Sequence, residues 1–189
     1  MHTEAAPIPH PASPDTPPPT RTVTPPPAPA GKAPARPTAA AAFHSISAAT
    51  TVLLGLVGIG AMIHEPVLIP PLAASAALVH SAPTLPLAQP RSVILGHLIG
   101  MATGFAVLAG LGSTAWAAAL AAGLTLALNM AARTPHSPAC ATAVIIVLQT
   151  PDPARFAPLL FASTVLLVLT GYAASRIRRA APRYPSYWW

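Results

Sequence analysis

Two short apolar segments, each beginning at a proline, place the strongest constraint on the fold of this chain. The first begins at Pro71 with Pro-Leu-Ala-Ala-Ser-Ala, and the second begins at Pro138 with Pro-Ala-Cys-Ala-Thr-Ala. A shift of 67 residues places Pro71 on Pro138, so that a proline, small residues, a hydroxyl residue and an aliphatic run occur twice. Proline favours the first turn of a helix. The repeat therefore predicts two related halves, each containing one short, proline-started helix.

The composition places these segments in a membrane. Apolar residues make up 53% of the 189 residues and charged residues only 7%, whereas soluble domains carry about 25% charged residues. The net charge of +6 comes from ten basic residues that are scattered and not interleaved with aromatic ones. We therefore expect a lipid bilayer as the partner and no binding of nucleic acid.

Six helical segments are expected, in two sets that each have the order long, short, long. The long segments are residues 40–63, 91–111, 114–132 and 155–177, and the short ones are residues 67–80 and 138–148. A full crossing of the hydrocarbon layer needs about 20 residues, so the short segments are shorter than an ordinary span. Small residues at helical spacing predict close packing of helix backbones; they are Gly55, Gly58 and Gly60 in the first segment and Gly96, Gly100 and Gly104 in the third.

The chain divides into a transmembrane domain, residues 39–178, and two tails. Residues 1–38 hold half of the 26 prolines and few large aliphatic residues, which predicts a disordered tail. Residues 179–189 are basic and aromatic, and with Arg176 and Arg178 they predict an anchor at the membrane surface in which Tyr184 takes part.

The basic residues also predict the orientation in the cell (inner) membrane. Arginines and lysines near both ends place both termini in the cytoplasm. If all six segments cross, Arg91 and Arg133 lie on the cytoplasmic face, and Glu65, Asp152 and Arg155 lie outside. If the short segments were re-entrant, the two arginines would lie outside, against the positive-inside rule. We therefore expect an all-α membrane protein with two three-helix repeats in inverted topology.

The two short helices offer candidate binding groups. A helix N-terminus carries partial positive charge and free N–H donors, which attract anions. The amides that follow Pro71 and Pro138 are therefore candidates, as are Ser75 and Thr142, which lie four residues into each helix at matching repeat positions. An alternative for both hydroxyls is a hydrogen bond to the carbonyl one turn earlier in the same helix.

Polar residues near the short helices extend this candidate site. Arg91 follows Gln89 and Pro90, His97 lies beside the glycine face, and Arg133 and His136 precede the second short helix. A buried cation is costly in a membrane unless it is paired, and the chain has only 4 carboxylates, so these residues indicate an anion path. The alternative for Arg133 is ordinary anchoring at the membrane surface, and the alternative for His97 is a structural hydrogen bond.

Other chemistry is not expected. The histidines lack the spacing of a metal site, and there is one cysteine, Cys140, so we expect no metal and no cofactor. Paired carboxylates, a Ser–His–Asp set and phosphate-binding glycine loops are absent from the sequence. We expect no catalytic residues and no enzyme.

Three motifs resemble those of the HPP family of integral membrane proteins over residues 45–175. They are the Pro71-Leu-Ala-Ala-Ser-Ala helix start, the run Leu87-Ala-Gln-Pro-Arg followed by Gly96-His97, and the run from Arg133 to Ala141, which stands where the family has its naming His-Pro-Pro. The chain departs from the pattern at three positions: Ser137 replaces the first proline of the name motif, and Ala73 and Cys140 each replace a glycine. The resemblance implies a multi-pass membrane protein, and plant plastid and cyanobacterial members are linked to nitrite transport.

Two functions follow as hypotheses. The first is a transporter or channel for a small inorganic anion, with nitrite as the anion that the resemblance implies. The second is a membrane scaffold without transport, which assembles through its glycine faces and uses the tails as docking segments; a homo-oligomer through Gly96, Gly100 and Gly104 is one such assembly. Buried arginine and histidine favour transport, because a scaffold needs small-residue faces but no polar groups inside the membrane.

Overall fold

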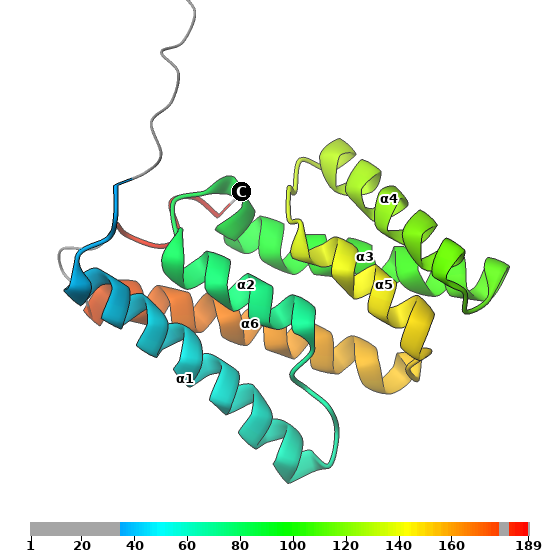
Figure 1. The fold of residues 1–189 in the computed structure, drawn as a ribbon, viewed down its shortest axis with the longest axis horizontal. Helices are drawn as coiled ribbons and strands as arrows, with labels where there is room; N and C mark the ends of the chain where they lie inside the picture. Colours follow the sequence, from blue (N-terminus) through cyan, green and yellow to red (C-terminus); the bar gives the residue numbers. More distant parts are fainter. Residues whose placement is uncertain (1–34, 178–181, 189) are drawn as a thin grey trace, which may run out of the picture. The chain divides into compact units, whose positions relative to one another are not determined.

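The computed structural model describes residues 35–177 and 182–188, so most of the predicted proline-rich tail lies outside the described residues. Residues from Pro37 onward form one compact unit, and the described part of that unit is helical (Figure 1). Its elements are α1 (Ala39–Ile63), α2 (Pro70–Ser81), the 3₁₀ turn η1 (Pro86–Ala88), α3 (Pro90–Leu111), α4 (Ala115–Ala131), α5 (Pro138–Gln149) and α6 (Pro153–Ile177). The six expected helical segments are thus confirmed, but α4, which was expected to be long, has only 17 residues.

Three of these helices, α1, α3 and α6, are long and apolar enough to cross a membrane. The short helices α2 and α5 have 12 residues each, which corresponds to about 18 Å at 1.5 Å per residue. α2 begins at Pro70, later than the expected start near residue 67. The reason is that residues before a proline favour extended backbone, as Ile69 shows with φ −113° and ψ 152°. The non-helical stretch before α2, with the buried Val67 and Ile69, adds to the distance that α2 alone covers.

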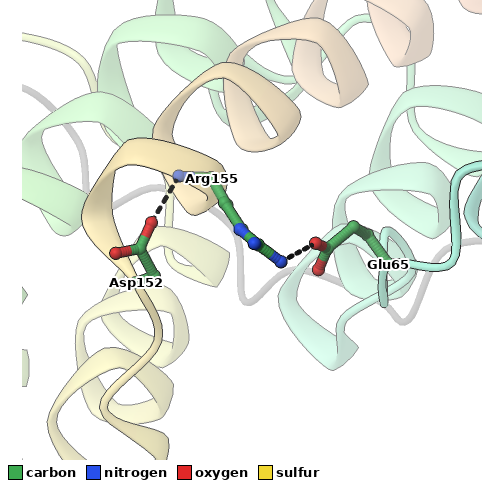
Figure 2. Close-up of polar contacts among 3 residues, drawn as sticks. All are labelled: Glu65, Asp152 and Arg155. Atoms are coloured by element: carbon green, nitrogen blue, oxygen red, sulfur yellow. Dashed lines mark hydrogen bonds and ion pairs between the residues drawn. The ribbon is translucent and has the colours of Figure 1, made fainter.

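The helices run back and forth between two ends of the unit (Figure 1). At one end, His136 Nδ1 lies 2.8 Å from the Leu87 carbonyl, which joins the α4–α5 and α2–α3 connections. At the other end, Arg155 donates to Glu65 over 2.7 Å, which joins the start of α6 to the α1–α2 connection (Figure 2). The Arg155 side chain is 73% exposed, so this ion pair contributes only about 0–1 kcal/mol. The ion pair shows that the α1–α2 connection and the start of α6 lie at the same end of the helical unit.

The glycine face of α3 packs against α5 of the same chain. A Cβ added at Gly96 would lie 2.6 Å from the His136 Cβ, and one added at Gly104 would lie 3.0 Å from the Ala143 Cα. At Gly100 it would overlap the Ala139 carbonyl group. The predicted close packing of backbones is therefore present. The predicted homo-oligomer contact through this face is wrong, because α5 already fills it.

The prediction that Gly55 and Gly58 mark a packed face is also wrong. Both are exposed, and a Cβ at either position would meet nothing within 4 Å. Gly60 is buried, but the atoms it faces belong to the connection that follows α1: a Cβ there would lie 2.6 Å from the Glu65 carbonyl oxygen. Gly60 therefore makes room for the reversal of the chain after α1. Among the described residues, Gly55 and Gly58 form no helix–helix contact.

The C-terminal segment differs from the predicted surface anchor at one residue. Tyr184 is 1% exposed and packs with Val79, Val93 and Val168, while Tyr187 and Trp188 are largely exposed. The Tyr184 hydroxyl has no hydrogen-bond partner among the described residues. Burial raises the pKa of this phenol above its ordinary value. Tyr184 is therefore a core residue.

Candidate functional site: a buried histidine cluster between the short helices

Four side chains from three helices and one loop form a polar cluster inside the bundle. His97 of α3 lies between the two short helices, with Nε2 at 2.8 Å from Ser75 Oγ and Nδ1 at 2.7 Å from Thr142 Oγ1. His136 Nε2 lies 2.9 Å from Ser75 Oγ, and its Nδ1 contacts the Leu87 carbonyl. All four side chains are at most 2% exposed. We call Ser75, His97, His136 and Thr142 the histidine cluster.

The glycine face of α3 explains how the cluster fits. Gly96 leaves room for the His136 side chain, and Gly100 lets the first turn of α5 lie directly on α3. The two imidazole rings then meet edge to face with centroids 4.7 Å apart. Small residues at this helix contact thus make space for two rings that face Ser75.

Ser75 Oγ lies within hydrogen-bond distance of both kinds of partner considered for it. Its Oγ lies 3.0 Å from the Pro71 carbonyl one turn earlier, the expected bond within the helix, and it also contacts both histidines. Thr142 faces His97. The two hydroxyls at matching repeat positions therefore meet at the same imidazole.

The first amides of the short helices are not free, against our expectation. Pro70 and Pro71 occupy the first turn of α2 and have no N–H, and the next two amides bond to the Ile69 carbonyl. At α5, Ala139 N donates to the His136 carbonyl over 3.1 Å. The proposed anion site at the amides after Pro71 and Pro138 is therefore wrong, because proline and the preceding turn leave no open donors there.

The two arginines also lie outside the cluster. Arg91 Nη2 donates to the Ala132 carbonyl over 2.9 Å, at the C-terminus of α4, where the helix dipole favours a cation. Arg133 is exposed and has a left-handed backbone with φ 56°. Arg91 therefore ties α3 to α4, and the structure does not bring Arg133 to the histidines.

Gln89 holds the α2–α3 connection and the C-terminal segment together. Its Nε2 donates to the carbonyls of Pro83 and Leu85, and its Oε1 accepts from Ser186 N over 2.9 Å. The residue is fully buried. Because its amide groups are engaged with backbone, Gln89 is a structural residue in this conformation and not an open ligand.

Two pockets approach α2 from opposite ends of the unit. One of about 500 Å³ is lined by Glu65 and Arg155 and reaches Leu72. The other, of about 520 Å³, lies between α1, α2 and α6 and is lined by His80, whose Nε2 has no partner in the described part of the chain. Ala76 lies between them in α2, within an apolar layer. No motif in the sequence marks His80 as a pocket residue.

The described residues contain no group of three or more histidine, cysteine or acidic side chains that could hold a metal. The cluster has only two imidazoles, and its other members are hydroxyls. The chemistry that this arrangement offers is hydrogen bonding and proton binding inside a low-dielectric bundle.

Comparisons with known proteins agree on the class of protein. The model of a family described as "HPP, transmembrane region" matches residues 34–185. The chain is 35% identical over 132 residues to a Dictyostelium discoideum protein named only as a transmembrane protein, covering 65% of this chain and 46% of that one. A second protein so named from the same organism is 34% identical over 126 residues, covering 62% and 40%. The chain thus spans less than half the length of these relatives, and no solved structure matches it.

Proposed function

The chain belongs to the family of the HPP transmembrane region, a multi-pass membrane family, and from this premise we propose that it transports a small inorganic anion. Nitrite is the first candidate, since the motifs described above resemble those of members linked to nitrite transport. The proposal concerns the domain in hand and does not extend to the longer relatives.

The histidine cluster is the observation that carries this proposal. Ionisable side chains inside a membrane bundle are expensive and usually mark a substrate or proton path. Here two imidazoles and two hydroxyls lie at the contact of three helices, each at most 2% exposed. Packing alone does not require them, because apolar residues of similar size would fill the same space. The scaffold hypothesis has less support, because the α3 glycine face through which a homo-oligomer was expected to form is covered by α5.

The pairing of helices supports the proposed inverted repeat. α1 packs on α2 and α6, and correspondingly α4 packs on α5 and α3. Individual contacts follow the same shift of 67 residues: Gly104 of α3 faces Ile146 of α5, and Gly171 of α6 faces Val79 of α2. Each short helix therefore lies between the first helix of its own half and the last helix of the other half.

This symmetry suits alternating access. In transporters built from inverted repeats, the substrate path lies at the interface of the halves, and rocking opens it to each side in turn. Ser75 and Thr142 belong to different halves and meet at His97. The two pockets approach α2 from opposite ends, and the apolar layer around Ala76 lies between them. We propose that movement of the halves connects the pockets in turn to the histidine cluster.

Nitrite uptake into proteoliposomes tests this function with two buried hydroxyl residues. Ser75→Ala removes contacts to both histidines, and two buried hydrogen bonds worth about 0.5–1.5 kcal/mol each correspond to a roughly 5- to 150-fold loss of uptake. Thr125→Val is the matched control, because buried Thr125 bonds to the Ala121 carbonyl within its own helix and lines neither pocket. Its uptake should equal that of the wild type. Equal uptake by both variants would remove the cluster from the transport path.

A further inference from the structure

The neutral histidine cluster forms a complete hydrogen-bond chain with one direction. His136 Nδ1–H donates to the Leu87 carbonyl, which leaves Nε2 as an acceptor. Ser75 Oγ–H then donates to that nitrogen, and Ser75 Oγ accepts from His97 Nε2–H. His97 Nδ1 finally accepts from Thr142 Oγ1–H. Each donor in the chain has one acceptor, so two neutral imidazoles fit without an unpaired polar atom.

The same atoms also fit one additional proton. If His136 Nε2 binds a proton, it becomes a donor to Ser75 Oγ, and the serine hydroxyl must turn elsewhere. The Pro71 carbonyl lies 3.0 Å away and accepts it. Ser75 Oγ then uses both lone pairs, one for each histidine. The cation therefore keeps a partner on both ring nitrogens after a single rotation of one hydroxyl.

A second proton is not accommodated. Two imidazolium rings with centroids 4.7 Å apart would repel each other strongly in the low-dielectric interior. No carboxylate of the described residues lies nearby to offset them, since Glu65 and Asp152 belong to the opposite end. The geometry thus sets the capacity of the cluster at one proton.

The surroundings of His136 contribute no competing charge at contact distance. From α3 it faces His97, from α2 Ser75, and from the turn before α3 the Leu87 carbonyl. The cation of Arg91 is engaged with Ala132, and Arg133 is exposed. Cys140 of α5 is the nearest thiol. The other buried polar side chains on the described elements around the cluster are His80 of α2, Gln89 before α3, Ser92 and Thr103 of α3, Thr125 and Asn129 of α4, Thr134 before α5, and Ser163 and Thr164 of α6.

We propose that the histidine cluster binds one proton at His136 and that this proton crosses the membrane together with the anion. This inference rests on the proposed function. An anion that reaches a dry interior needs a compensating positive charge, and imidazolium at His136 supplies it. By linkage, anion binding and proton binding then strengthen each other by the same factor. The substrate pair is therefore one proton with one monovalent anion, and transport is electroneutral.

The test measures nitrite and protons in the same proteoliposomes, with an internal pH dye and buffered valinomycin–potassium to clamp the voltage. Inward nitrite should acidify the lumen by one proton per anion, and an imposed inward proton gradient should accelerate uptake. Undissociated acid also crosses bare lipid, so protein-free vesicles provide the baseline. Nitrite uptake above this baseline without proton movement would overturn the coupling and leave the transport function standing. No uptake above it would overturn the transport function itself.

Two variants and a spectroscopic readout separate proton binding from transport. His136→Gln keeps a donor and an acceptor but cannot titrate, so its uptake should lose the response to the proton gradient. His64→Gln, which alters an exposed histidine after α1 that lines neither pocket, should keep that response. In protein labelled with ¹⁵N-histidine, one imidazole of the cluster should become doubly protonated on acidification. In Ser75→Ala the second protonation of the ring should need a proton concentration at least about tenfold higher. A hydrogen bond to a charged group is worth more than the 1.4 kcal/mol that corresponds to a tenfold change in an equilibrium constant. An unchanged titration in Ser75→Ala would contradict the proposal even if transport were absent.

Discussion

Replacing Gly100 by alanine should destabilise the protein more than replacing any other glycine by alanine. The new Cβ would overlap the Ala139 carbonyl group in the first turn of α5. A backbone carbonyl cannot rotate away as a side chain would, so α5 must move off α3. Overpacking typically costs about 1–3 kcal/mol, and we expect the upper end of that range. The measurement is thermal unfolding of the purified protein in detergent.

Gly123→Ala is the control for this experiment. Gly123 also lies inside a helix, α4, but it is exposed, and a Cβ there meets nothing within 4 Å. Alanine should stabilise this helix by up to about 1 kcal/mol, because glycine is a poor helix former. The two variants should therefore shift the melting temperature in opposite directions. If Gly100→Ala melted at or above the wild-type temperature, the close α3–α5 contact would be incorrect.

The variant His97→Leu should abolish nitrite transport and also lower stability. Leucine fills the space but removes the bonds that join Ser75 of the first half to Thr142 of the second. Interhelical hydrogen bonds in membrane proteins average only about 0.6 kcal/mol. An unpaired hydroxyl in a dry interior costs about 1–3 kcal/mol, however. We therefore expect a loss of about 2 kcal/mol and uptake at the level of empty vesicles.

The repeat supplies the matched control for His97. A shift of 67 residues places His97 on Thr164 of α6, which is equally buried but bonds only to the Phe161 carbonyl in its own helix. The variant Thr164→Val removes a local bond and no contact between the halves. It should retain at least half of the wild-type uptake. Similar losses in both variants would mean that burial, and not the link through His97, accounts for the effect.

The helices could be predicted because proline and apolar length leave few alternatives. Pro70, Pro90, Pro138 and Pro153 each occupy the first position of a helix, where the missing N–H costs nothing. The glycines show where this reasoning stops. Gly55 and Gly58 have the same small-residue character as Gly96 and Gly100, but only the second pair is packed: Gly96 faces His136 in the connection before α5, and Gly100 faces Ala139 in α5. The spacing of glycines along one helix does not predict which other helix packs on which of its faces.

The candidate site was predictable only in part, for a related reason. The 67-residue shift identified Ser75 and Thr142 as equivalent, but it did not reveal that one imidazole would bridge them. Gln89 and Arg91 suggested a substrate site because polar groups in apolar sequence are costly. Their partners are backbone groups, and the carbonyl that Arg91 binds lies 41 residues away in the chain. The sequence alone does not distinguish such a tertiary bond from a ligand contact.

The central claim is that both short helices cross the membrane, so that the two halves are inverted and meet at the histidine cluster. Single cysteines at positions 84, 113, 133 and 152, in a Cys140→Ala background, test it with an impermeant thiol reagent on intact cells. Positions 113 and 152 should label from outside, and positions 84 and 133 only after the membrane is permeabilised. The background protein, without cysteine, should not label. Labelling of position 84 from outside would mean that α2 is re-entrant, and the inverted arrangement would be contradicted.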